Sequence, residues 1–150
     1  MSNYIHKQHN VSILRYHIVC ACKYRRLVMT EKVDRVLKET CLEIAKRYEI
    51  MFVEIGVEKD HVHFLVQSVP MYSPTKIVQI IKSITAREVF ARDPEVKKQL
   101  RGGEFLGKGF FISTVGLHGD VEVIAQYVKN QGREKEYKSL HKQQLSLDLF

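Results

Sequence analysis

The order of strand and helix patterns along the chain is the feature that most constrains its fold. Residues 11–22 are rich in strand-forming side chains and predict a strand. Apolar residues at helical spacing over 33–48, with Thr30 as the N-cap, predict a helix. Residues 51–58 and 61–69 predict two further strands joined by a tight turn, and therefore an antiparallel hairpin.

The second half of the chain adds another helix and another strand. Ser73 as N-cap and Pro74 at the first helical position predict a helix that ends at Asp93. Residues 110–115 predict a fourth strand, and Asp120 begins a last helix. The order β-α-β-β-α-β is that of the ferredoxin-like, split βαβ fold of the α+β class, with both helices on one face of an antiparallel sheet.

Charge and composition narrow the choice of partner and compartment. The 150 residues include 24 Lys and Arg against 17 Asp and Glu, a net charge of +7 that favours a polyanion such as nucleic acid. The three cysteines form no C-x-x-C motif, and neither a signal peptide nor a membrane-length apolar stretch is found. We expect a cytoplasmic protein without a membrane partner, with one domain over 11–133, a mobile segment over 1–10 and a polar tail over 134–150.

Two histidines one residue apart stand inside the third predicted strand. Side chains alternate along a strand, so His61 and His63 share one face and Val62 lies on the other. By strand rise their backbones are roughly 7 Å apart, which suits two ligands of one metal ion. With Val62 toward the helices, both histidines point to the open sheet face, a platform for single-stranded nucleic acid. The alternative to a metal site is that both residues are half-exposed histidines with only a structural role.

Three other side chains have a chemical and a structural interpretation. Tyr127 and Gln131 are spaced i, i+4 on the last predicted helix and so lie on one of its faces. They could reach over the sheet, or be a boundary tyrosine and a solvated glutamine. Asp60 precedes His61 and could orient its ring, or be only a turn acid.

Four segments of the chain form an ordered set. They are Tyr16–Val19 with the basic turn Lys23–Arg26, the motif Asp60–His63, the strand Gly109–Gly116, and Tyr127–Gln131. This set resembles the single-tyrosine HUH transposases of small insertion sequences (the TnpA type), which have the REP-associated tyrosine transposases as relatives. The resemblance covers residues 11–133, which it identifies as a catalytic domain.

The resemblance implies a metal-dependent enzyme that cleaves and rejoins single-stranded DNA at insertion-sequence ends. It implies that His61, His63 and Gln131 hold Mg²⁺ or Mn²⁺, and that Tyr127 attacks phosphorus to form a 5′-phosphotyrosine. It also implies a homodimer with active sites shared between subunits, acting on single-stranded DNA with hairpin ends.

Basic side chains on the turn, helices and loops are candidate contacts to DNA phosphates, although each taken singly also fits a solvated surface charge. These candidates are Lys23, Arg25, Arg26, Lys76, Lys82, Arg87, Lys108 and Lys129. No nucleotide cofactor is expected. Gly102, Gly107 and Lys108 have the spacing that begins a phosphate-binding P-loop. Gly109 stands where that motif has Ser or Thr, however, and a strand follows where the motif needs a helix.

Two other functions stay open. A domesticated relative would process repeated hairpins in a host genome with the same chemistry. A non-catalytic ferredoxin-like module would stack RNA or single-stranded DNA on its sheet. The second gives no reason for His61, His63, Tyr127 and Gln131 to occur together.

Overall fold

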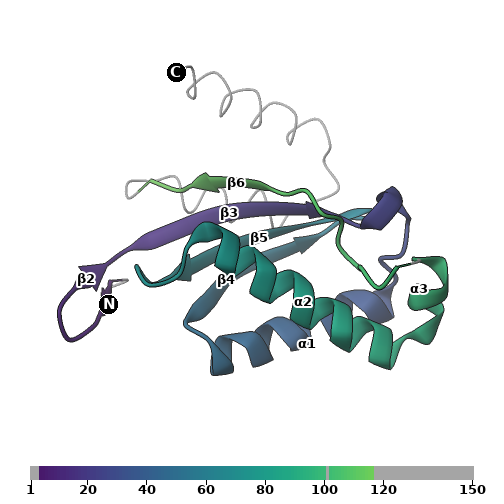
Figure 1. Ribbon diagram of the computed structural model, residues 1–150, viewed down its shortest axis with the longest axis horizontal. Helices are drawn as coiled ribbons and strands as arrows, with labels where there is room; N and C mark the ends of the chain where they lie inside the picture. The colour runs from purple at the N-terminus through teal and green to yellow at the C-terminus, as the bar shows by residue number, and fades with distance from the viewer. Residues whose placement is uncertain (1–3, 101, 117–150) are drawn as a thin grey trace, which may run out of the picture.

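The computed structural model describes residues 4–100 and 102–116 and contains one four-stranded antiparallel sheet. Its order β4-β5-β3-β6 is built from β3 (Leu14–Ala21), β4 (Ile50–Val57), β5 (His61–Ser68) and β6 (Phe111–Thr114). Helices α1 (Glu31–Arg47) and α2 (Pro74–Arg92) cover one face of the sheet (Figure 1). The predicted β-α-β-β-α-β order is therefore confirmed, while the predicted last helix lies outside the described residues.

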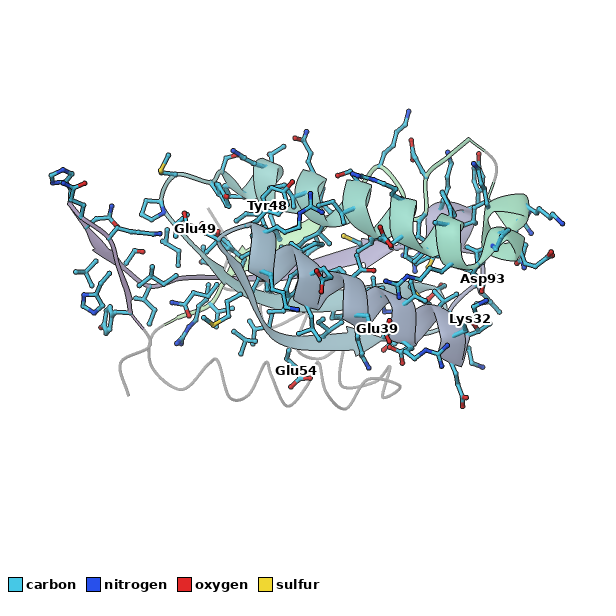
Figure 2. The ribbon with its side chains drawn as sticks, turned by 90° about the horizontal axis from the view of Figure 1, so that it is seen from below. Lys32, Glu39, Tyr48, Glu49, Glu54 and Asp93 are labelled. Atoms are coloured by element: carbon cyan, nitrogen blue, oxygen red, sulfur yellow. The ribbon has the colours of Figure 1, made fainter. Side chains whose placement is uncertain are left out.

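The two long helices begin at the caps that the sequence predicts. Thr30 Oγ1 accepts a hydrogen bond from the backbone N–H of Val33 at 3.2 Å, and Ser73 Oγ accepts from that of Lys76 at 3.1 Å. Each cap satisfies a helix N–H that has no partner inside the helix. Figure 2 shows the start of α1 (Lys32) beside the end of α2 (Asp93), so the two helices run antiparallel.

The hydrophobic core lies between the helices and the sheet. Ile18, Phe64 and Val66 of the strands and Leu37 and Ile81 of the helices are almost completely buried there. Val62 belongs to the same core, as its place in the strand alternation predicts. None of the helices described within 4–100 and 102–116 is long and apolar enough to cross a membrane.

The N-terminal part of the chain departs from the prediction. Ile5–His6 (β1) pairs with Val11–Ser12 (β2) in a small antiparallel ribbon, and the mobility expected over 1–10 stays a prediction. The backbone N–H of Lys7 closes its turn by donating to the carbonyl of Asn10 at 2.8 Å. The strand predicted over 11–22 is consequently divided between β2 and β3.

The sheet face opposite the helices is more buried than the prediction of an open face allows. His63 is 0% exposed, His17 2% and Gln67 3%. Their polar groups are engaged with neighbours on the same face, His63 with His17 and Gln67 with Arg15. The predicted face was right for His61 and His63, but the open exposure expected of His63 was wrong.

Candidate functional site

Three potential metal ligands gather where β4 and β5 meet. Glu58, His61 and His63 each offer one ligand atom, and these atoms all lie within 4.8 Å of one another. The backbone N–H of Glu58 donates to the carbonyl of His61 at 2.8 Å, which closes the predicted hairpin and fixes the carboxylate beside the imidazoles. One carboxylate and two imidazoles form a donor set for a divalent cation.

The ring of His61 is oriented by acids on both sides. Its Nδ1 lies 2.7 Å from Asp60 Oδ1, and its Nε2 lies 2.6 Å from Glu58 Oε2. Asp60 therefore makes the orienting contact predicted as one of its two alternatives. Burial opposes ionisation of Asp60, but the hydrogen bond and charge of His61, together with Arg25, lower its pKa. The Asp60 carboxylate consequently holds Nδ1 of His61 and leaves Nε2 toward the cluster.

His63 is held from inside the sheet. Its Nδ1 lies 3.0 Å from Nε2 of His17, and the two rings are both buried. Burial, followed by the influence of His17 and His61, lowers the pKa of His63 to about 2. His63 is therefore neutral at physiological pH, which is the form that binds metals.

His17 and Glu58 are the two site residues that the sequence analysis missed. His17 is a polar residue in an apolar strand, and this exception to the strand pattern could have identified it. In the β3–β5 register His63 faces Val19, so His17 is its diagonal neighbour. Glu58 is the last residue of the strand predicted over 51–58, and its spacing of three residues before His61 is the signal that could have identified it.

The basic turn after β3 lies at the same end of the sheet as the metal-ligand cluster. Ala21 pairs with His61 across the sheet, and the N–H of Cys22 donates to the carbonyl of Asp60 at 2.7 Å. Arg25 Nη1 lies 3.5 Å from Asp60 Oδ2. The candidate DNA contacts of this turn, Lys23, Arg25 and Arg26, are thus brought close to His61.

The other candidate DNA contacts are dispersed. Lys76 lies in the first turn of α2, after the far end of β5, about 20 Å along that strand from His61 by strand rise. Arg87 and Lys108 are exposed. Lys82 is half-buried, and its ammonium donates to the carbonyls of Gly107, Lys108 and Gly109 at 2.5, 2.9 and 3.0 Å.

These contacts make Lys82 a clamp on the loop before β6, while its contact with a DNA phosphate stays a prediction. The remaining predicted site residues, Tyr127, Gln131 and Lys129, lie outside the described residues.

Comparison with known proteins identifies the family. A family model described as "Transposase IS200 like" matches residues 10–131. The ISDra2 transposase TnpA of Deinococcus radiodurans is 30% identical over 118 residues, which cover 79% of this chain and 84% of the relative. The transposase for insertion sequence element IS200 of Salmonella typhimurium is 26% identical over 120 residues, covering 80% and 78%.

Solved structures agree with the sequence comparison. The crystal structure of a candidate transposase from Deinococcus radiodurans matches with a TM-score of 0.68 at 29% identity, covering 85% of this chain and 97% of that one. A REP-associated tyrosine transposase bound to a REP hairpin shares the fold, with a TM-score of 0.53 at 12% identity and coverage of 85% and 70%. The chain therefore belongs to the IS200-like transposase family.

Proposed function

We propose that the protein cleaves and rejoins single-stranded DNA at insertion-sequence ends, using Tyr127 as the nucleophile and a divalent cation. Glu58, His61 and His63 would hold the cation, and Gln131 would complete the ligand set. The observation that carries this proposal is the convergence of three ligand atoms within 4.8 Å in a chain of the transposase family.

The side chains of this site fit Mg²⁺ or Mn²⁺. The oxygen of Glu58 and the imidazole nitrogens of His61 and His63 suit an ion with open coordination positions. The side chains of Glu58 and His61 are 16% and 14% exposed, so the cluster is sheltered but can be reached from solvent. When bound, the cation would polarise the scissile phosphate and orient it for in-line attack.

Tyr127 would supply the covalent step. Its phenolic oxygen attacks phosphorus and loses its proton, one P–O bond to the tyrosine forms, and the bond from phosphorus to the 3′ oxygen breaks. The departing strand takes up a proton and leaves as a 3′-OH, while the other strand stays attached as a 5′-phosphotyrosine. Attack by a second 3′-OH reverses these steps, so strand joining needs no nucleotide cofactor.

Hairpin-bearing single-stranded DNA is the proposed substrate. The basic turn beside His61 offers the exposed Arg25 and Arg26 to the phosphate backbone, while Lys23 is half-buried and pairs with Glu104 at 3.6 Å. The similar fold of a protein solved with a REP hairpin favours hairpin DNA, and it keeps genomic repeat processing as a second candidate function. Subterminal hairpins in the DNA flanking the gene would decide for the insertion-sequence role.

Labelled single-stranded oligonucleotides from those flanks test the proposal. The wild type and the control His6→Ala, which changes an exposed histidine of β1, should cut them with Mn²⁺ and stop when EDTA is added. His61→Ala should bind the same DNA without cutting it. Binding without cutting by the wild type, at every divalent ion tried, would instead identify a non-catalytic binding module.

We also propose that two subunits share each active site, with Tyr127 of one subunit facing the histidines of the other. The test mixes Tyr127→Phe with His61→Ala, which are each inactive. Shared sites predict that subunit exchange restores activity, with the DNA attached to the His61→Ala chain. No activity after verified exchange would refute sharing and leave the chemistry untouched. His61 is the better choice for this test because His63 is wholly buried.

A further inference from the structure

Two buried imidazoles stand edge to edge behind the metal-ligand cluster. His17 Nε2 and His63 Nδ1 are 3.0 Å apart, the ring centroids are 5.3 Å apart, and the ring planes differ by only 18°. Such nearly coplanar rings with nitrogen facing nitrogen form an in-plane hydrogen bond. Phe111 packs its ring at 73° against His17, with 6.2 Å between centroids, and restrains it.

Only one proton can lie between these two nitrogens, and its position decides what His63 can bind. A neutral imidazole carries one N–H and one lone pair. If His17 donates, the proton of His63 lies on Nε2, and that nitrogen cannot ligate. If His63 donates from Nδ1, its Nε2 carries the lone pair. Since Nδ1 is turned to His17, Nε2 is the nitrogen that a metal at the cluster would use.

We propose that His17 accepts a hydrogen bond from Nδ1–H of His63 and so fixes the tautomer that presents the Nε2 lone pair to the cation. This inference rests on the proposed function, and it makes His17 a positioning residue that acts through His63. Asp60 serves His61 in the same way at Nδ1.

The two acceptors, the Asp60 carboxylate and the His17 imidazole, differ in chemistry because they differ in burial. Asp60 is partly exposed, whereas His17 is 2% exposed beside a ring that is 0% exposed. An ionised carboxylate at the position of His17 would carry a large desolvation cost, and a neutral imidazole avoids it.

Two matched variants test the assignment. His17→Gln keeps an oxygen acceptor near the position of Nε2, and His17→Leu removes the acceptor but keeps an apolar side chain. Nitrogen NMR of the histidine rings in the metal-free protein reports the tautomer, and calorimetry reports Mn²⁺ binding. We expect Nδ1–H at His63 in the wild type and in His17→Gln. His17→Leu should lose this tautomer preference and bind Mn²⁺ about 10–100-fold more weakly.

The outcomes separate this inference from the proposed function. A wild-type His63 protonated at Nε2, or a folded His17→Leu variant with unchanged tautomer and Mn²⁺ affinity, would overturn the role of His17. If the wild type binds no divalent ion, the proposed metal site fails, but the tautomer measurement still decides the hydrogen bond. If His17→Leu does not fold, the His63 tautomers of the wild type and of His17→Gln decide whether His17 accepts this hydrogen bond.

Discussion

Replacing either histidine of the motif should abolish activity, but only one replacement should damage the fold. His63→Ala removes a ring that is 0% exposed and leaves His17 Nε2 without the hydrogen bond it makes at 3.0 Å. The buried cavity and the lost partner together should cost about 2–4 kcal/mol of unfolding free energy. His61→Ala should cost less than about 1 kcal/mol, because its partners Glu58 and Asp60 are both partly exposed and water can replace the ring.

Urea denaturation in EDTA measures these costs without a contribution from bound metal. His6→Ala, at an exposed histidine, is the control and should match the wild type. Equal denaturation midpoints for His61→Ala and His63→Ala, with unchanged slopes, would refute the buried imidazole pair. The expected difference also means that lost activity in His63→Ala does not by itself identify a metal ligand.

Three further predictions concern the cluster and the loop beside it. Glu58→Gln removes the one anionic donor of the Glu58–His61–His63 cluster and should weaken Mn²⁺ binding at least about tenfold by calorimetry, whereas unchanged affinity would limit Glu58 to pairing with His61. Lys82→Met removes three hydrogen bonds to loop carbonyls and should lower the unfolding free energy in urea by about 1–3 kcal/mol. Lys108→Met, at an exposed lysine, is the control, and equal stability of the two variants would contradict the clamp. Acid should destabilise the metal-free protein, because the pKa of His63 is about 2 when folded against 6.5 when unfolded, so the unfolded chain binds the extra proton. This stability is complete above pH 6.5 and falls by about 1.4 kcal/mol per pH unit below it, and a folded His63→Gln variant with the same slope would contradict this origin.

Local patterns were sufficient to predict the strands, the helices and their caps. Thr30 and Ser73 cap α1 and α2 because the signals for a helix start lie within four residues of each cap. The side chain of Val62 was placed toward the core for the same reason, since strand alternation is a local property.

Contacts between distant residues could not be predicted in this way. His17 and His63 are 46 residues apart, and their pairing depends on the β3–β5 register. The clamp of Lys82 on the loop at 107–109 likewise joins residues at least 25 apart, so the sequence suggested a DNA contact or a solvated surface charge instead. Tyr127 and Gln131 stay predictions, because they lie outside the described residues.

The covalent protein–DNA adduct is the measurement that tests the central proposal most directly. Wild-type protein is incubated with labelled single-stranded DNA from the gene flanks and Mn²⁺, and the modified peptide is identified by mass spectrometry. Tyr24→Phe is the matched control, since Tyr24 is an exposed tyrosine of the basic turn that adjoins the metal-ligand cluster. We predict a 5′-phosphotyrosine at Tyr127 that persists in Tyr24→Phe, disappears in Tyr127→Phe and requires the divalent ion. An adduct that survives in Tyr127→Phe, or that maps to Tyr24, would contradict the proposed nucleophile.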